Sequence, residues 1–271
     1  MQASSDSGTS NTDNVTSDNT PTFSVPSGQA NVILLVDGVE VAATYNPSTG
    51  EITPTGTIAD GTHQISIKTV DAAGNVSLAS TALPVTIDTT APVVPTVTTQ
   101  TTSNLHPTLG GTATLAAGET LTVAINGATF TIDPAATTQP AGISYNASTG
   151  AWSVNTGTAV PTSGTLAVFA DGRYPVTATV TDKAGNSSVD TSTNELVIDT
   201  TALNITLSGG STLNTNDTTP VISGTLAGAG NLANTPVTLK IGGATYTVLP
   251  DASGNFTLDT GTAVPTSGTF A

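Results

Sequence analysis

The chain has 271 residues, no cysteine, and 19 acidic side chains against 4 basic ones, which gives a net charge of −15. We therefore expect no nucleic-acid partner and no attraction to anionic membranes, since both are polyanions. Disulfides and thiol chemistry are excluded as well. No apolar run approaches the roughly 18 residues of a membrane-spanning helix, so we expect no direct membrane insertion.

The first predicted feature is a polar, acidic opening, residues 1–20, which contains Asp6, Asp13 and Asp18 and does not resemble a signal peptide. A segment rich in Ser, Thr and Asn without an apolar pattern is typical of a solvated, mobile tail. The same acids could instead bind a cation together with other carboxylates. Both interpretations stay open at this point.

Three apolar runs, LLVDGVEV, TVAINGAT and LKIGGATY, each contain a two-residue turn that favours a β-hairpin. The turn pairs are Asp37-Gly38, Asn126-Gly127 and Gly242-Gly243. A type I′ turn requires positive φ at both positions, which Gly, Asn and Asp accept best.

A second turn follows each hairpin, and the large residue after it is expected in the core. The turns centre on Gly50, Gly150 and Gly254, and the core residues are Ile52, Trp152 and Phe256. The next strand alternates with period 2, which is the pattern of a half-buried strand and not of a helix. The residues expected to face inward are His63, Ile65, Ile67 and Thr69 in the first copy, and Tyr174, Val176, Ala178 and Val180 in the second.

The pattern recurs along the chain, since the stretch IDTT at 87–90 returns at 198–201. We divide the chain into repeat 1 (residues 1–89), repeat 2 (90–200) and repeat 3 (201–271). About seven short strands per copy, with turns roughly every 8–12 residues, predict an all-β fold. The specific prediction is tandem immunoglobulin-like antiparallel β-sandwich domains arranged end to end.

Repeat 3 ends at Ala271, which aligns with Ala167 of repeat 2. It therefore has no counterpart of the last two strands, and repeat 1 lacks the Asp-Thr-Thr lead-in of the other copies. We interpret the chain as an excerpt from a longer array. We expect repeat 3 not to fold stably as written, because backbone groups and an apolar face would be left unpaired.

One short string occurs twice, as Asp71-Ala-Ala-Gly-Asn75 and as Asp182-Lys-Ala-Gly-Asn186. As a turn, it uses Gly for the left-handed conformation and the Asp carboxylate to accept main-chain hydrogen bonds. As a ligand loop, it offers a carboxylate and an amide carbonyl, which are hard oxygen donors. The two interpretations do not exclude each other.

The stretches VDAAGNVS…VTIDTTAP (70–92), VTDKAGNSS…LVIDTTA (180–202) and ASSDSGTSNTDNVTSDNTPTF (3–23) resemble bacterial Ig-like repeats of giant Gram-negative surface and biofilm adhesins. The resemblance implies an extracellular stalk on the bacterial cell surface, exported by type 1 secretion and built from neighbouring repeats of one chain. It also implies Ca²⁺ where domains meet. Binding to a cell-surface or biofilm matrix ligand would belong to other domains.

Strand direction suggests which acids meet at each boundary. Asp60, Asp88 and Asp182, with Asn186, are expected at the first boundary. Asp171 and Asp199, joined by Asp217, are expected at the second. Asp6, Asp13 and Asp18 could join Asp71 at the outer pole of repeat 1. Clustered carboxylates repel one another without a cation, so Ca²⁺ is the expected ligand.

Two further functions stay open beside the stalk. One is a ligand-binding module for a glycan or a protein, although the chain has one Trp and four Tyr to anchor such a ligand. The other is a subunit of an extracellular fibre. We expect no enzyme: the chain contains no nucleophile motif or phosphate loop, and His63 and His106 belong to different copies.

Overall fold

The computed structural model describes residues 1–210, 215–228 and 232–270. The chain divides into two compact units. One comprises Met1–Gln100, His106–Val168 and Tyr174–Leu196, and the other comprises Thr101–Leu105, Phe169–Arg173 and Val197–Ala271. The described residues are all-β apart from one 3-10 turn, η1 (Leu232–Asn234). No helix among them is long and apolar enough to cross a membrane.

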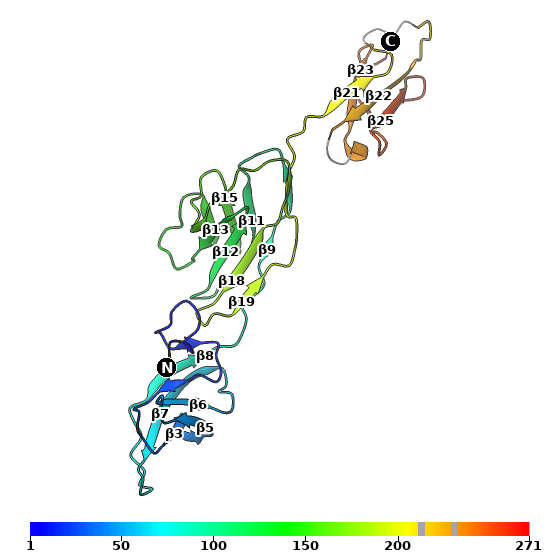
Figure 1. The fold of residues 1–271 in the computed structure, drawn as a ribbon. Coiled ribbons are helices and arrows are strands. Elements are labelled where there is room, and N and C mark those ends of the chain that lie inside the picture. Colours follow the sequence, from blue (N-terminus) through cyan, green and yellow to red (C-terminus); the bar gives the residue numbers. More distant parts are fainter. Residues whose placement is uncertain (211–214, 229–231, 271) are drawn as a thin grey trace. The chain divides into compact units, whose positions relative to one another are not determined.

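Repeat 1 is a sandwich of a five-stranded sheet, in the order β1-β8-β7-β3-β4, and a three-stranded sheet, in the order β2-β6-β5 (Figure 1). Its strands are β1 (Val15–Thr16), β2 (Phe23–Ser24), β3 (Asn31–Val36), β4 (Val39–Val41), β5 (Ala43–Asn46), β6 (Glu51–Pro54), β7 (Gly61–Val70) and β8 (Leu83–Ile87). Neighbouring strands are antiparallel, except that β1 runs parallel to β8. The core between the sheets consists of Phe23, Val32, Leu34, Ile52, Ile58, Ile65, Val85 and Ile87.

The three predicted hairpin turns are confirmed by their backbone conformations. Both residues of every pair have positive φ, between 46° and 87°. The pairs join β3 to β4, β12 (Thr120–Ile125) to β13 (Ala128–Ile132), and β23 (Val237–Ile241) to β24 (Ala244–Val248). This conformation matches the twist of the flanking strands, so the turn residues set each hairpin locally.

The predicted core position after the second turn is also confirmed, because Ile52, Trp152 and Phe256 are all buried. Val176, Ala178 and Val180 are buried as well. The alternation predicted for β7 holds less well.

In β7, Ile65 is buried, whereas His63, Ile67 and Thr69 are half-exposed. Ser66, on the face expected to be solvated, is buried opposite Leu35, which is itself buried. At this point both faces of the sheet are covered. A period-2 pattern predicts one buried and one solvated face, so it does not identify this position.

Residues 1–20 are not a solvated tail. Thr16 and Ser5 are buried, and Thr16 Oγ1 donates a hydrogen bond to the Ser5 carbonyl at 2.5 Å. The β1–β8 pairing joins Val15 to Thr86 and Thr16 to Ile87. The mobile-tail interpretation is therefore wrong, because the segment obtains its order from a strand about 70 residues further along.

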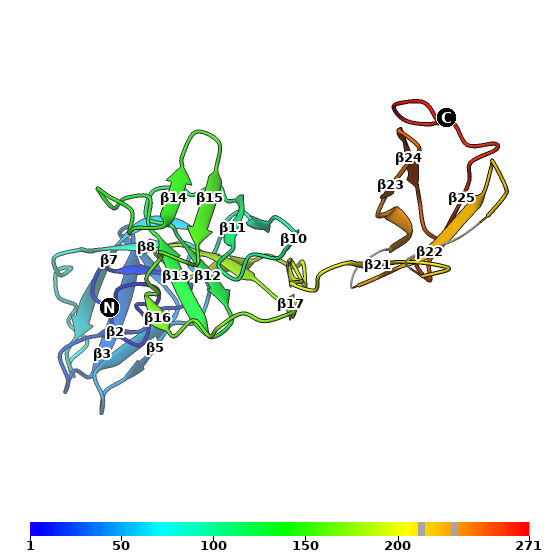
Figure 2. The ribbon, with the colours of Figure 1, turned by 90° about the horizontal axis from the view of Figure 1, so that it is seen from above.

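Repeat 2 contains a four-stranded sheet, β14-β15-β11-β9, a five-stranded sheet, β16-β13-β12-β18-β19, and a three-stranded sheet, β10-β20-β17. Its remaining strands are β9 (Thr96–Val97), β10 (Gln100–Thr102), β11 (Thr108–Thr112), β14 (Ile143–Asn146), β15 (Ala151–Asn155), β16 (Ser163–Gly164), β17 (Gly172–Tyr174), β18 (Thr177–Thr181), β19 (Ser187–Val189) and β20 (Leu196–Ile198). Residues 158–169 of repeat 2, which have no counterpart in repeat 1, contain β16, and β16 lies beside β13 (Figure 2).

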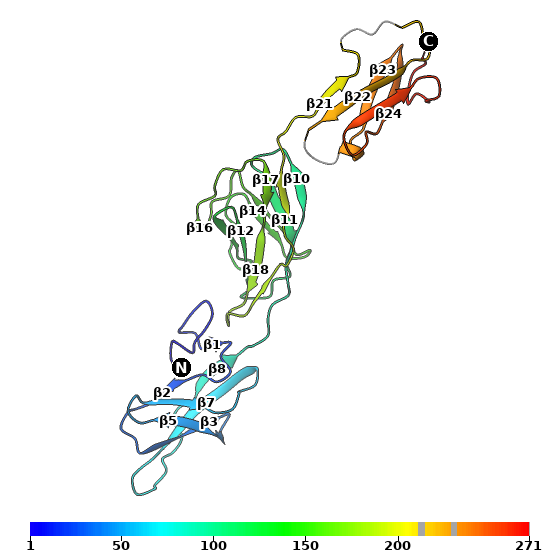
Figure 3. The ribbon, with the colours of Figure 1, turned by 45° about the vertical axis from the view of Figure 1, so that its right-hand side comes forward.

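Repeat 3 contains the sheets β21-β22-β25 and β23-β24, with β21 alongside β22 (Figure 3). The strands not yet given are β21 (Asn204–Leu207), β22 (Val221–Ala227) and β25 (Asn255–Asp259). Its core includes Leu226, Val237, Tyr246 and Phe256. Leu207 is 44% exposed, although its counterpart Val97, which pairs with the equivalent glycine, is 9% exposed. The instability of repeat 3 stays a prediction.

Candidate functional site at the junction of repeats 1 and 2

The Asp-x-Ala-Gly-Asn string of repeat 1 is a closed turn after β7. Asp71 Oδ1 accepts hydrogen bonds from the main-chain N–H groups of Ala73 and Asn75, at 2.9 and 2.8 Å, and Oδ2 accepts one from Asn75 Nδ2 at 2.8 Å. These bonds, foremost the one from the Asn75 side chain, hold the pKa of Asp71 below its ordinary value. All five residues of the turn are exposed.

The same turn in repeat 2 is partly buried. Asp182 Oδ1 accepts the main-chain N–H groups of Gly185 and Asn186, at 2.7 and 2.9 Å, and Oδ2 accepts Asn186 Nδ2 at 2.8 Å. Asp182 is 7% exposed and Ala184 is fully buried. Both hydrogen bonds from the Asn residue to the Asp carboxylate are thus the same in the two repeats, the third comes from Ala73 in one turn and from Gly185 in the other, and the surroundings differ.

Repeat 3 contains a third turn of this kind, which our sequence analysis did not connect with the other two. In Asp251-Ala-Ser-Gly-Asn255, Asp251 Oδ1 accepts the Asn255 N–H at 2.8 Å and Oδ2 accepts Asn255 Nδ2 at 3.0 Å. The shared signal is Asp-x-x-Gly-Asn. This turn joins a different pair of strands, so the string specifies a turn wherever it occurs and is not by itself a metal site.

The docking of repeat 2 onto the acidic opening of repeat 1 distinguishes the second turn from the other two. The Ala184 carbonyl accepts hydrogen bonds from Ser7 Oγ at 2.6 Å and from the Ser17 N–H at 3.2 Å. The Lys183 carbonyl accepts one from the Thr9 N–H at 3.4 Å. The turn of repeat 2 therefore binds repeat 1 largely through main-chain atoms.

Two glycines permit this close approach. A Cβ atom on Gly8 would lie 2.0 Å from the Lys183 carbonyl oxygen, and one on Gly185 would lie 2.9 Å from Gly8 Cα. Both glycines have a φ of 95°, which side chains disfavour. In repeat 1, by contrast, a Cβ on Gly74 would meet no atom within 4 Å.

The chain that leaves repeat 1 is also held at this junction. Asn186 Nδ2 donates a hydrogen bond to the Asp88 carbonyl at 2.7 Å, in addition to its bond within the turn. Ser188 Oγ donates one to the Pro92 carbonyl at 2.6 Å. Asn186 thus links the turn to the end of β8, where we predicted that Asp88 and Asp182 meet.

Asp60 has a different role from the one expected at that boundary. Its carboxylate accepts Thr89 N–H and Thr89 Oγ1 on one oxygen and Thr90 Oγ1 on the other. Asp88 Oδ1 accepts the Thr90 N–H at 3.0 Å. The hydrogen bond from Thr89 Oγ1 is the main reason why the pKa of Asp60 is lowered. Asp60 therefore fixes the exit of the chain from repeat 1.

The second boundary repeats this arrangement with new residues. Asp171 accepts Thr200 N–H and Thr200 Oγ1, at 2.8 and 2.6 Å, and Thr201 Oγ1 at 3.0 Å, which lowers the pKa of Asp171. Asp199 Oδ1 accepts the Thr201 N–H at 3.0 Å. The expected partner Asp217 instead makes local bonds with Thr219.

Asp6 carries an unpaired buried oxygen at the junction. Its side chain is 5% exposed, and its Oδ2 accepts the Asn14 N–H at 3.1 Å, while Oδ1 is buried without a hydrogen-bond partner. Burying a carboxylate oxygen without a partner is unfavourable. A cation or a proton at Oδ1 would remove that penalty.

Asp6 and Asp13 do not join Asp71 at the outer pole, as one interpretation of the sequence proposed. Asp13 Oδ1 accepts the N–H of Val15, which is the first residue of β1. Strand β1 pairs with the end of β8 near Asp88. Asp71 follows the far end of β7, whose other end pairs with Ile87. At about 3.3 Å per residue, ten residues place the two poles roughly 30 Å apart.

The expected calcium centres are not formed among the described residues. No three acidic or histidine side chains within that part of the chain lie close enough together to hold a metal ion. The expected centres at Asp60, Asp88 and Asp182 and at Asp171 and Asp199 are not assembled, because those carboxylates bind Thr and main-chain groups. The unpaired Asp6 oxygen, near the docked turn, has the character of an incomplete cation ligand.

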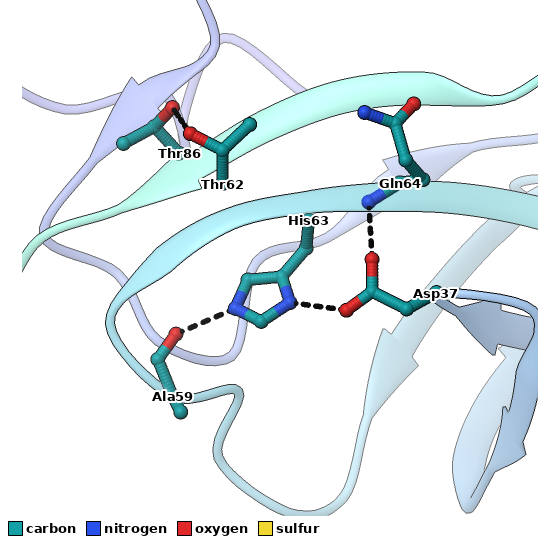
Figure 4. A network of polar contacts seen from close by, with 6 residues as sticks. All are labelled: Asp37, Ala59, Thr62, His63, Gln64 and Thr86. Atoms are coloured by element: carbon teal, nitrogen blue, oxygen red, sulfur yellow. Dashed lines mark hydrogen bonds and ion pairs between the residues drawn. The ribbon is translucent and has the colours of Figure 1, made fainter.

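His63 belongs to a separate polar network in repeat 1 (Figure 4). Its ring lies between Asp37 Oδ2, 2.7 Å from Nδ1, and the Ala59 carbonyl, 2.9 Å from Nε2, and Asp37 also accepts the Gln64 N–H. The bond to Asp37 raises the pKa of His63. This network secures the β3–β4 turn.

Most of the chain is similar to known proteins. Residues 1–89 and residues 87–200 each match a family described as bacterial Ig-like domain. Among solved structures, it is similar to fibronectin(III)-like modules of Clostridium thermocellum CbhA, with 10% identity, 68% of this chain and 87% of that chain covered, and a TM-score of 0.39. It is also similar to Bacteroides ovatus mixed-linkage glucan utilization locus SGBP-B in complex with a mixed-linkage heptasaccharide, with 17% identity, 91% and 56% covered, and a TM-score of 0.22.

The comparison with curated proteins found no match. The two family matches together span residues 1–200, in agreement with the β-sandwich architecture. Bacterial Ig-like domains are typically non-catalytic and are typical of bacterial surface or extracellular proteins. Residues 1–200 are therefore two bacterial Ig-like domains in tandem.

Proposed function

We propose that these tandem domains are an extender segment in the stalk of a bacterial cell-surface adhesin, and that Ca²⁺ bound at the junction of repeats 1 and 2 stiffens it. The docking of the Asp182 turn onto the acidic opening of repeat 1, beside the unpaired Asp6 oxygen, supports the proposal. The stalk supports adhesion or biofilm formation, and the ligand of the adhesin binds to other domains of the protein.

In a stiff stalk, each junction has to hold the angle between neighbouring domains fixed. The junction suits that task, because four hydrogen bonds to main-chain carbonyls cross it: two to Ala184 and one each to Lys183 and Asp88. Main-chain groups have little freedom to rearrange, so such contacts restrict the angle between domains more than contacts between long side chains do.

Calcium would complete the junction through oxygen ligands, which it prefers in sets of six to eight. Asp6 would supply its free oxygen. Asp182 retains unused lone pairs beside its three hydrogen bonds and is the acidic residue of the docked turn. Neutralising Asp6 is the chemical contribution of the ion, since the described residues around it provide no cationic partner to its Oδ1.

The direct test is a calorimetric titration of the 271-residue chain with Ca²⁺ after chelation, with Asp6→Asn as the variant and Asp71→Asn as its matched control. We expect wild type to bind and to gain about 2.7 kcal/mol of stability at a hundredfold excess over Kd. Asp6→Asn should abolish both effects, whereas Asp71→Asn, in the undocked turn, should leave them unchanged. A wild-type chain with no binding heat and an unchanged Tm would refute calcium binding.

The sign of the Asp6→Asn effect provides an independent check. In chelator, a neutral amide should stabilise the junction, because an unpaired buried carboxylate is removed. In Ca²⁺ the same variant should be less stable than wild type. A destabilising effect of equal size in both conditions would mean that Asp6 has a purely structural role.

The extender role is tested by the distance between repeats. Because the chain lacks cysteine, spin labels can be placed at Leu78→Cys in repeat 1 and Val160→Cys in repeat 2, which are 93% and 71% exposed. We expect a narrow distance distribution in Ca²⁺ and a broad one in chelator. A broad distribution in both conditions would exclude a rigid extender.

A further inference from the structure

Repeats 2 and 3 cover the outer strand of their first hairpin with a segment of their own chain. In repeat 2 the Thr162 N–H donates a hydrogen bond to the Thr129 carbonyl of β13 at 2.8 Å, and in repeat 3 the Thr266 N–H donates one to the Thr245 carbonyl of β24 at 2.7 Å. Both threonines add a bond from Oγ1 to the same carbonyl at 3.0 Å. The covering segments share the sequence Thr-Ala-Val-Pro-Thr-Ser-Gly-Thr.

Repeat 1 has no such segment, because its chain passes from β6 to β7 through residues 55–60 alone. The residue equivalent to Thr129 and Thr245 is Glu40 in β4. Among the described strands, β3 is the one neighbour of β4. Val36 pairs with Val39 across the two-residue turn, so the main-chain groups of Glu40 point away from β3, toward the open edge.

A cavity of about 420 Å³ lies beside this edge. Its lining includes Val36, Val41, Pro54 and Ile58, with His63 of the Asp37 network. Val36 and Val41 are half-exposed, whereas their counterparts Ile125 and Phe130 in repeat 2 are fully buried. The cavity and the open edge therefore occur together in the repeat that lacks the covering segment.

We propose that the β4 edge of repeat 1 binds an extended, uncharged segment of a separate protein by strand addition, in the place that Thr162–Thr165 takes in repeat 2. Such a segment would donate an N–H to the Glu40 carbonyl and accept the Glu40 N–H. The occupant is inferred from the two repeats in which this place is filled, and the inference is independent of the stalk function.

The covering segments also define the chemistry of the partner. The glycine is required, because a Cβ on Gly164 or Gly268 would lie 2.1 or 2.2 Å from the carbonyl oxygen of the hairpin glycine. Five residues after the proline stands a large apolar residue, Leu166 or Phe270, and Phe270 packs against the core of repeat 3. The equivalent side chain of a partner would enter the cavity.

Charge explains why the segment should be neutral. Glu40 already forms an ion pair with Lys68, with Nζ 3.1 Å from Oε1, so the edge offers no free charge of either sign to a partner. Charged residues on an edge strand also discourage indiscriminate pairing. A partner strand is therefore selected by its glycine and its apolar residue and not by its charge.

The test uses the 271-residue chain and a synthetic peptide with the sequence of residues 159–168, AVPTSGTLAV. The control is the same peptide N-methylated at the threonine that corresponds to Thr162, which removes the donor to the Glu40 carbonyl and changes no side chain. We expect the first peptide to slow exchange of the Glu40 amide hydrogen at least tenfold at saturation and to shift the methyl resonances of Val36 and Val41.

The control peptide should do neither. If neither peptide protects Glu40, or if both do so equally, the proposal is wrong. A third measurement identifies the source of the partner. If raising the concentration of the chain alone protects Glu40, the edge is occupied by a second copy, and our assignment to a separate protein is overturned.

Discussion

The turns at Asp71–Asn75 and Asp182–Asn186 share the two hydrogen bonds from the Asn residue to the Asp carboxylate, and they lie in different environments. One is exposed throughout, and the other is docked on the acidic opening of repeat 1, with Ala184 buried. The difference shows that Asp-x-Ala-Gly-Asn specifies a shape that is complete before any contact is made. Docking then uses groups on the outside of the turn. These are the carbonyls of Lys183 and Ala184, and Gly185, whose missing side chain leaves room for Gly8.

The largest effect should separate the two aspartates. Asp182→Ala removes three hydrogen bonds to a buried carboxylate and releases Asn186, so we expect a loss of about 2–3 kcal/mol in the unfolding free energy of repeat 2. Trp152, the one Trp of the chain, reports that transition by fluorescence. Asp71→Ala should have a smaller effect on β7, measured by hydrogen exchange. Equal losses would show that docking adds nothing to the turn.

A methyl group should distinguish the glycines of the two turns. Gly74→Ala introduces strain at a φ of 89° but no clash, and we expect a loss of about 1 kcal/mol. Gly185→Ala places a methyl group 2.9 Å from Gly8 Cα, so we expect it to lower the unfolding free energy by about 2 kcal/mol. The Ser17 amide, which bonds to the Ala184 carbonyl, should also lose its protection from hydrogen exchange. An unprotected Ser17 amide in the Gly74→Ala variant would contradict this interpretation.

The asparagines should differ by one hydrogen bond. Asn75→Ala and Asn186→Ala both remove a side-chain bond to the turn aspartate, but Asn186→Ala also removes the bond to the Asp88 carbonyl. We therefore expect Asn186→Ala to be more destabilising by about 1 kcal/mol, measured by denaturant unfolding of the 271-residue chain. If the two variants were equally stable, the link to Asp88 would have no net value.

The smallest effect should be the loss of stability of repeat 1 at low pH, which depends on Asp71 in the exposed turn. The pKa of Asp71 is lowered from 3.8 in the folded chain, so its contribution to stability is present above that pH and is lost as the pH falls through the folded pKa. Asp71→Asn should make the unfolding free energy of repeat 1 less dependent on pH below about 4. Carboxylate titration by NMR measures the pKa directly, and an unshifted value would remove the effect.

Much of the fold could be predicted because its signals are local. The hairpin pairs, the Gly-centred turns and the core position of Ile52, Trp152 and Phe256 depend on the φ preference or size of single residues. The Asp-x-Ala-Gly-Asn turn depends on five consecutive residues. The third example, Asp251–Asn255, could have been found by the same pattern, had we searched for Asp-x-x-Gly-Asn without the alanine.

The candidate site was predicted less well, because the sequence around an acidic residue does not indicate which groups its carboxylate will contact. We expected Asp60 to meet Asp88 and Asp182 around an ion, but its carboxylate is occupied by Thr89 and Thr90. We expected Asp6 either in solvent or at the outer pole, and it is buried at the opposite end of repeat 1. Each acid had several possible partners, and period and spacing do not choose among them.

The sequence by itself thus determined the tandem β-sandwich repeats and the shape of their turns, since those depend on residues a few positions apart. The tertiary structure decided that β1 pairs with β8 in parallel, that Ser7 reaches Ala184 across 177 positions, and that the Asp6 oxygen is enclosed without a partner. The physical reason is that a turn closes on its own hydrogen bonds, whereas docking depends on which two distant surfaces come close enough to exclude water.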